Sequence, residues 1–286
     1  MHYRIFSLLC LLCGLAQAAR GQASYVGTVG GAPVELALNE TEEGQLAGVY
    51  MYVKFGTPIA LGGQLRGGTL TLTEKDAQGK AAATLTIRAF TAEASQLTGT
   101  WRSLATGQSL PVTLAVAPVR NELLQVATLK DSYFKLVLAD PLGGTGNRVV
   151  AVKLFAKKTN RLVQQVRVDC QLQGLFSVQV GDYNFDGLPD FSIFESSYAG
   201  PNTSSLYLLY DPAKRRFVNS GYAGTSLEFD AKARRVYEHN SCCAGTSVTS
   251  AEYKVVRNRL VLVAHHCLRW DEKKQELVER PYSACQ

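Results

Sequence analysis

Short segments in which apolar and polar side chains alternate recur along most of the chain, and glycine-rich or Asx-rich turns separate them. The strictest example is residues 69–73, where threonine alternates with leucine. A period of two places one face of each segment in a core and the other in solvent, as in antiparallel strands. Regular turns between such segments are typical of sandwiches and barrels. The sequence therefore predicts an all-β protein.

The β pattern falls into two series with a break between them. Pro118 ends the first series, and Asn121 precedes a stretch, residues 122–129, that we expect to form a short helical turn. A second series of strands then runs nearly to the C-terminus. We predict two antiparallel β domains, each a sandwich, a barrel or a propeller-like unit, at residues 19–118 and 130–286.

The first 18 residues have the features of a secretory signal peptide. His2 and Arg4 form a short positive start, an apolar stretch follows, and Ala18 ends a small-residue cleavage site. Cleavage there predicts a periplasmic or secreted protein. No apolar run of 18 residues follows, so we expect no integral membrane segment in the mature chain.

Export favours disulfides between the cysteines that remain. Adjacent cysteines do not bond each other easily, so Cys242 and Cys243 are expected to pair with two cysteines further on. These are Cys267 and Cys285. Cys170 is then left as a free thiol.

Zinc is the alternative for the C-terminal cysteines, because His239, His265 and His266 lie nearby in the sequence. The adjacent cysteine pair lacks the two- to four-residue spacer that lets two thiolates reach one tetrahedral ion. The sequence therefore favours disulfides over zinc.

Residues 182–190 fit the pattern D-x-N-x-D-G-x-x-D, which is the strongest motif in the chain. Oxygen donors on every second residue of a tight loop point at one centre, and Gly187 permits the sharp turn. Ca²⁺ takes six to eight oxygens at about 2.3–2.6 Å. The expected ligands are the side chains of Asp182, Asn184, Asp186 and Asp190 and the carbonyl of Leu188.

The residues around this motif distinguish it from an EF-hand. The twelfth position, which is a glutamate in EF-hands, is Ile193 here, and both flanks alternate like strands rather than helices. The sequence predicts a strand–loop–strand calcium site with a structural role. The alternative is an acidic turn that binds no ion.

Charge and motifs argue against several functions. The net charge of +6 is scattered, and no Lys/Arg block is long enough to indicate nucleic-acid binding. Nucleophile elbows, phosphate loops, dinucleotide fingerprints and the H-E-x-x-H motif are missing from the sequence. Glu195 is the single weak nominee for an acid of a hydrolase. We therefore expect a binding protein rather than an enzyme.

Two tyrosines lie in segments suited to contact with a partner. Residues 196–205 join two expected strands with small and polar residues around Tyr198, and Tyr222 lies in a similar short segment. Tyrosine among Ser, Gly and Asn is common at contact surfaces, because its ring supplies area at a small entropy cost. The alternative for either residue is a ring that packs back on the sheet.

Several of these features together resemble one bacterial family. They are the calcium motif with its flanks, the loop around Tyr198, the run 206–212 and the run 240–245. They resemble exported immunity proteins that neutralise peptidoglycan-hydrolase effectors of a bacterium-killing type IV secretion system. Those proteins are similar in fold to periplasmic lysozyme inhibitors. The resemblance covers roughly residues 130–286 and implies an all-β inhibitor with a structural calcium ion.

Three functions compete at this point. The first is an exported binding protein whose partner is a lysozyme-like peptidoglycan hydrolase that it inhibits. The second is a calcium-stabilised adhesion or carbohydrate-binding module, and the third is a hydrolase with scattered acids. The sequence favours a binder, because no activated nucleophile or paired acids are evident.

Overall fold

Antiparallel strands make up the protein, which confirms the all-β prediction. The helical pieces in the part of the chain that the structure describes are three short 3-10 turns. Within that part, no helix has the length and apolar character needed to cross a membrane. The predicted signal peptide, residues 1–18, lies outside the described residues. This computed structural model describes residues 22–40, 46–76, 78–91, 94–139 and 148–285.

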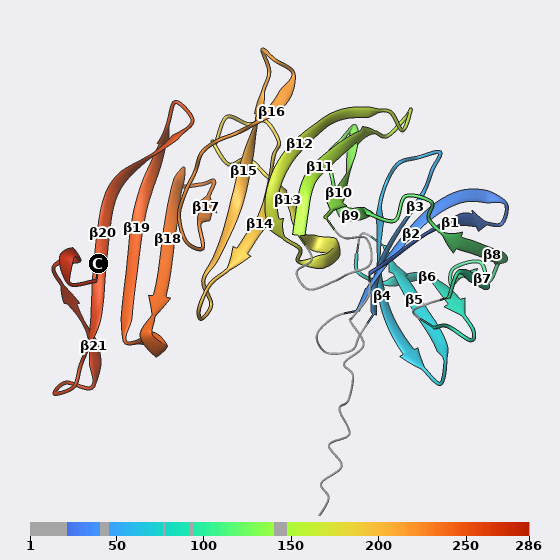
Figure 1. Cartoon of the computed structure of the whole chain (residues 1–286), viewed down its shortest axis with the longest axis horizontal. Coiled ribbons are helices and arrows are strands. Elements are labelled where there is room, and N and C mark those ends of the chain that lie inside the picture. Colours follow the sequence, from blue (N-terminus) through green and yellow to red (C-terminus); the bar gives the residue numbers. More distant parts are fainter. Residues whose placement is uncertain (1–21, 41–45, 77, 92–93, 140–147, 286) are drawn as a thin grey trace, which may run out of the picture.

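Eight strands at the N-terminal end form a closed barrel, drawn in blue to green in Figure 1. Each strand pairs with the next along the chain, and β1 (Ala23–Val29) also pairs with β8 (Ser109–Val116), which closes the ring. Of the forms that the sequence left open for this half, the barrel is the one observed. The strands between are β2 (Ala32–Glu40), β3 (Leu46–Tyr52), β4 (Ile59–Arg66), β5 (Thr69–Lys75), β6 (Ala81–Ile87) and β7 (Gln96–Ser103).

The inward-facing half of the alternating side chains fills the barrel. Leu70 and Leu72 of β5 are fully buried, and the threonines beside them are partly exposed. Tyr25, Leu36 and Ile87 belong to the same apolar cluster. Full burial of a side chain of this kind stabilises a fold by about 1.5–3 kcal/mol. The barrel therefore has a substantial core of its own.

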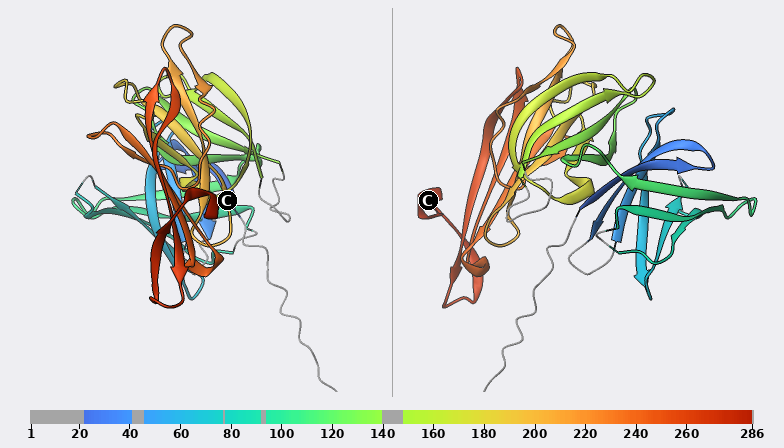
Figure 2. Two further views of the ribbon diagram at one scale, coloured as in Figure 1. Left: turned by 90° about the vertical axis from the view of Figure 1, so that its left-hand side faces the viewer. Right: turned by 45° about the vertical axis from the view of Figure 1, so that its right-hand side comes forward.

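Three further sheets, which we call the first, middle and last sheets, follow the barrel in chain order as simple antiparallel meanders. Figures 1 and 2 show them running from the barrel to the far end of the molecule, where the C-terminus lies. The first sheet contains β9 (Glu122–Thr128), β10 (Ser132–Leu138), β11 (Arg148–Ala156) and β12 (Leu162–Gln171). The middle sheet contains β13 (Val178–Gly181), β14 (Asp190–Ser197), β15 (Thr203–Asp211) and β16 (Arg216–Asn219). The last sheet contains β17 (Glu228–Asp230), β18 (Arg235–Cys242), β19 (Ser247–Val256), β20 (Arg259–Asp271) and β21 (Glu276–Arg280).

The segment after the barrel is a strand, β9, so the helical turn expected at residues 122–129 is wrong. Leu123, Leu124 and Gln125 are buried one after another. The strand pairs with β10 and also packs into the core shared with the barrel, so side chains on both of its faces are covered. A short run of this kind cannot be told from a buried helix by its periodicity. The amide of Gln125 bonds to two backbone groups in the segment that leads into the middle sheet.

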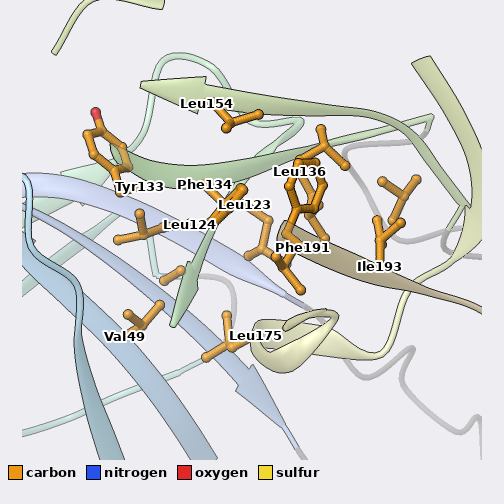
Figure 3. Packing of buried hydrophobic residues seen from close by; sticks show 14 of the residues in the cluster. Val49, Leu123, Leu124, Tyr133, Phe134, Leu136, Leu154, Leu175, Phe191 and Ile193 are labelled. Carbon is orange, nitrogen blue, oxygen red and sulfur yellow. The ribbon is translucent and has the colours of Figure 1, made fainter. Parts of the chain in front are cut away.

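One apolar core joins the barrel to the first and middle sheets. Val49 comes from β3 of the barrel, Leu124 from β9 and Phe191 from β14. Figure 3 shows these side chains in one cluster with Phe134, whose ring centroid is 5.0 Å from that of Phe191. The two halves of the chain therefore share buried surface.

The last sheet is covered far less than the others. Only Cys267 is buried among the thirteen residues of β20. A small cluster around Tyr207, Leu209 and Tyr222 joins the middle sheet to Phe229 of β17. Burial is therefore lowest in the last sheet, at the C-terminal end.

Candidate calcium loop and contact hairpin

The D-x-N-x-D-G-x-x-D segment is a loop between β13 and β14, which is the predicted strand–loop–strand arrangement. Gly181 pairs with Asp190 and holds the two ends of the loop together. Phe185 and Gly187 have φ angles of 61° and 87°, a region that glycine adopts readily and phenylalanine does not. Contacts hold Phe185 there, because its ring is buried and its carbonyl accepts a 2.6 Å hydrogen bond from the guanidinium of Arg234.

The polar side chains of the loop bind its backbone from inside. Asp182 accepts hydrogen bonds from the backbone N–H groups of Asp186 at 3.0 Å and Gly187 at 2.8 Å. Asp186 accepts one from the N–H of Leu188 at 2.8 Å. Asn184 accepts one from Asp186 at 3.2 Å. Because each of these oxygens has more than one lone pair, the bonds leave acceptor capacity for a cation.

Asp190 is the most buried carboxylate of the loop. It is 0% exposed, and its oxygens accept hydrogen bonds from the N–H groups of Tyr183 at 2.9 Å and Tyr210 at 2.8 Å. Burial raises the pKa of Asp190 to about 6, although both hydrogen bonds oppose the shift. The charges of Asp186 and Asp182 raise this pKa further. A cation among the three carboxylates would favour the ionised form of Asp190.

The donor set of the loop fits a hard cation such as Ca²⁺. The predicted ligands supply carboxylate, amide and carbonyl oxygens and no thiol or imidazole. Within the described residues, no three His, Cys, Asp or Glu side chains gather closely enough to form a metal site by themselves. An ion here would therefore need the amide oxygen of Asn184 and the carbonyl of Leu188 in addition to the aspartates. Calcium binding at these residues stays a prediction.

The connection between β14 and β15 is shorter than expected. The two strands reach into the predicted stretch 196–205 and leave only residues 198–202, which we call the contact hairpin. The N–H of Tyr198 donates a 2.9 Å hydrogen bond to the carbonyl of Asn202 and closes its tip. Tyr198 is 55% exposed. The structure therefore places this predicted contact residue at the surface of a closed turn.

The hydroxyl of Tyr198 is held by two serines of the flanking strands. It lies 3.2 Å from Oγ of Ser204, and Oγ of Ser204 lies 3.0 Å from Oγ of Ser196. Hydrogen bonding to Ser196 and Ser204 lowers the pKa of Tyr198. The side chain thus has a preferred orientation while much of its ring remains accessible.

Asn202 anchors the contact hairpin to the last sheet. Its Nδ2 donates hydrogen bonds to the carbonyls of Ser241 at 2.7 Å and Ala199 at 3.0 Å. Its Oδ1 accepts one from the N–H of Ser241 at 3.0 Å. The hairpin therefore lies beside the end of β18, next to the turn Cys243–Gly245. Sequence reasoning missed Asn202, because its partner Ser241 is 39 residues away and a turn asparagine carries no signal of such a contact.

The expectation that Tyr222 forms a surface contact is corrected by its burial. Tyr222 is 7% exposed, and its ring centroid lies 6.1 Å from that of Tyr207 and 6.3 Å from that of Phe229. The segment around it connects β16 to β17, and the ring packs back into the fold, which is the alternative stated above. Tyr198 remains the exposed tyrosine of the two.

The expected pairing of Cys242 and Cys243 with the two C-terminal cysteines is wrong. Cys267 of β20 is instead bonded to Cys285, which lies in the turn after β21. Cys242 ends β18, two strands away from Cys267, and neighbouring strands are about 4.8 Å apart, so the pair exceeds the reach of a disulfide. Cys242 and Cys243 are exposed thiols, and Cys170 is a free thiol as predicted, with its side chain buried.

His265 and His266 of the last sheet have partners other than a metal. His265 stacks on Tyr282 with ring centroids 4.0 Å apart, and Nδ1 of His266 lies 2.8 Å from the carboxylate of Glu279. Among the residues that the structure describes, no cluster of His, Cys, Asp or Glu suits a metal. The zinc alternative therefore gains no support.

Glu195, the nominee for a hydrolytic acid, is half-buried near Cys170. Burial raises the pKa of the Cys170 thiol to about 12, and the charge of Glu195 raises it further. A neutral thiol beside a carboxylate is not an activated nucleophile.

Comparison with known proteins identifies no family for the chain. No family model matches it, and no curated protein matches it. A solved structure described as a Xanthomonas type IV secretion system related protein is 11% identical and covers 90% of this chain and 99% of its own, with a TM-score of 0.28. A GH43_1 enzyme from Xanthomonas citri complexed with xylose is 9% identical and covers 91% and 90%, with a TM-score of 0.23. Likenesses this weak carry no argument about function.

Proposed function

We propose that the protein is an exported, calcium-stabilised inhibitor of a lysozyme-like peptidoglycan hydrolase, and that the contact hairpin enters the sugar-binding cleft of that enzyme. The observation that carries the proposal is the exposed ring of Tyr198 on a hairpin that is closed by its own backbone and anchored by Asn202.

An inhibitory loop must lose little freedom when it binds, because ordering a mobile segment subtracts from affinity. The bonds from Asn202 to Ser241 and from Tyr198 to Asn202 order this hairpin before binding. Ala199 and Gly200 beside the ring are small and exposed, which suits entry into a narrow cleft. A phenol can cover a surface made for a sugar ring and donate a hydrogen bond to a catalytic carboxylate.

The calcium loop and the contact hairpin lie at opposite ends of one strand. Asp190 begins β14, and the hairpin follows its eighth residue, Ser197. An ion that fixes the start of β14 would also fix the direction in which the strand presents Tyr198. This is a structural role for calcium, at a distance from the cleft of the partner.

Two features support export of the protein. The predicted signal peptide would direct it to the periplasm or beyond the cell. The disulfide Cys267–Cys285 belongs to the type of bond that persists in oxidising compartments.

The test is the clearing of a peptidoglycan suspension by lysozymes of several structural classes, with and without the purified protein. Wild type should inhibit at least one of them. Tyr198→Ala should weaken that inhibition by about thirtyfold or more, because a buried tyrosine anchor contributes about 2 kcal/mol or more to such interfaces.

Tyr237→Ala is the matched control, since Tyr237 is an exposed tyrosine on β18 at 38% exposure. It should inhibit like wild type. If wild type inhibits no enzyme of the panel, the inhibitor proposal is wrong. If it inhibits but the two variants behave alike, the contact hairpin is the wrong surface.

A further inference from the structure

A groove of about 460 Å³ lies between the middle and last sheets. Its floor is the face of the middle sheet opposite to the shared core, and residues of β17 form the facing wall. Figure 1 shows β15 and β17 next to each other in this region. The volume falls within the range of about 300–1,000 Å³ that is usual for small-molecule sites. The contact hairpin and the predicted calcium ligands take no part in the lining.

The floor is built from two rows of register partners. Gln179 of β13, Ser192 of β14 and Tyr207 of β15 form one row, and Phe194 and Ser205 form the next. Opposed residues of antiparallel strands point to the same face of the sheet. All five side chains therefore face the groove, as their place in its lining also indicates.

Aromatic rings line the inner wall. The ring centroid of Tyr183 lies 4.9 Å from those of Tyr207 and Phe229, which are also 4.9 Å from each other. The hydroxyl of Tyr183 lies 2.9 Å from Oγ of Ser192, which fixes its ring against the floor. Phe194 is half-buried at the same groove. The groove thus offers ring surface in a fixed orientation.

The groove also contains polar side chains that make no hydrogen bond within the described part of the protein. The side-chain amides of Gln173 and Gln179 are exposed and have no hydrogen-bond partner among the described residues. Each offers two N–H bonds and one carbonyl. Glu228 adds a carboxylate, and none of the described lining residues is Lys, Arg or His. The site can therefore donate and accept hydrogen bonds but brings no positive charge.

We infer that this groove binds a short neutral saccharide. A pyranose ring presents an apolar C–H face to aromatic side chains and hydroxyl groups to amides. An anionic ligand would meet Glu228 without a compensating cation. An apolar ligand would cover Gln179 and remove water from its amide without replacing the hydrogen bonds. The inference is independent of hydrolase inhibition, because it concerns a different surface.

The test is titration of the full-length mature protein with two neutral trisaccharides, tri-N-acetylchitotriose and cellotriose, followed by calorimetry and by amide chemical shifts. At least one should bind, with the largest shifts at β13, β14 and β17. Phe194→Leu keeps an apolar side chain and removes the flat ring face, and Gln179→Ala removes one amide. Each should weaken binding about five- to tenfold, as expected for the loss of one hydrogen bond or one ring contact.

Thr100→Ala is the matched control, because Thr100 lines a larger groove on the outside of the barrel, and the described lining of that groove has threonines and arginines but no aromatic residue. It should bind the sugars like wild type, as should Tyr198→Ala, which separates this test from that of hydrolase inhibition. Thermal melting of each variant shows whether it folds. If folded wild type binds neither sugar at millimolar concentrations, or if the groove variants bind like wild type, the inference is wrong.

Discussion

The barrel and the last sheet are both antiparallel, but only the barrel encloses its own apolar side chains. Leu70 and Leu72 are 0% exposed in β5, whereas Leu262 and Val263 of β20 are 49% and 48% exposed. When a sheet closes into a barrel, the inner face of every strand is covered by the barrel itself. An open sheet at one end of the molecule has no such interior, so each of its faces stays exposed unless another element packs against it. In the last sheet, the small cluster with the middle sheet covers part of one face.

Specific links take the place of burial in the last sheet. The disulfide Cys267–Cys285 ties β20 to the C-terminal turn. Asn202 ties the middle sheet to Ser241, and the hydroxyl of Tyr253 donates a 2.6 Å hydrogen bond to Glu238. The two ends should therefore be sensitive to different substitutions. The barrel should lose stability when a buried side chain is shortened, and the C-terminal region should lose stability when a disulfide or a hydrogen bond between strands is removed.

The largest effect is expected inside the barrel. Leu72→Ala removes a fully buried side chain and should lower the free energy of unfolding by about 2–5 kcal/mol. Leu262→Ala, the matched leucine of β20, should change it by no more than about 0.5 kcal/mol. Urea unfolding of both variants measures the difference. Equal losses of unfolding free energy in the two variants would contradict the difference in burial between the two ends.

The disulfide is expected to rank next. It closes a loop with a sequence separation of 18, for which chain entropy predicts a stabilisation of about 3 kcal/mol. In the double variant Cys267→Ser, Cys285→Ser, amide hydrogen exchange should quicken in β19 to β21 and stay slow in the barrel. Faster exchange throughout the chain would show that the disulfide supports the whole fold.

Calcium should stabilise the C-terminal region by a similar amount. A ligand that binds only the native state at a hundredfold excess over its Kd adds about 2.7 kcal/mol, so Tm should rise with Ca²⁺ and fall with EDTA. Asp186→Ala should remove most of this rise. Asp76→Ala is the control, because Asp76 accepts similar backbone hydrogen bonds in a barrel turn. If EDTA does not change the Tm of wild type, the predicted calcium site is wrong.

A smaller, pH-dependent effect is expected from Asp190. Its pKa in the ion-free fold is raised to about 6, above the unfolded value of about 3.9. Its contribution to stability in EDTA is therefore fully present below about pH 4 and is lost as the pH rises through 6. Calcium requires the ionised carboxylate, so the calcium-induced rise in Tm should be smaller at about pH 5 than at about pH 7. A calcium-induced rise that is equal at both values would contradict the role of Asp190.

Local pattern was sufficient to predict most strands. Alternation such as that of residues 69–73 arises because one face of the strand is buried and the other is exposed. The pattern is the same whichever element covers the buried face, so it can be recognised without knowing the tertiary structure. The strand–loop–strand position of residues 182–190 also follows from the sequence, since both flanks of the loop alternate like strands. By contrast, β9 is covered on both sides and has no alternation to detect.

Long-range partners explain the predictions that were wrong or incomplete. The disulfide depends on which segments are neighbours in space, and the separations along the chain, 18 residues from Cys267 to Cys285 and 25 from Cys242 to Cys267, do not decide between the two partners. Tyr222 and Tyr198 lie in similar small-residue segments, and Tyr222 is the buried one because its ring packs against Tyr207 and Phe229. The groove at Gln179 joins segments that the sequence separates by about fifty residues.

The core that the barrel shares with the sheets has a consequence for how the protein divides. Val49 and Met51 of the barrel and Leu123 and Leu124 of β9 belong to one cluster. A cut in the connection between β8 and β9 would leave apolar surface bare on both fragments. The halves are therefore not interchangeable modules: the barrel and the first and middle sheets each serve as a scaffold for the other, and these parts should unfold together.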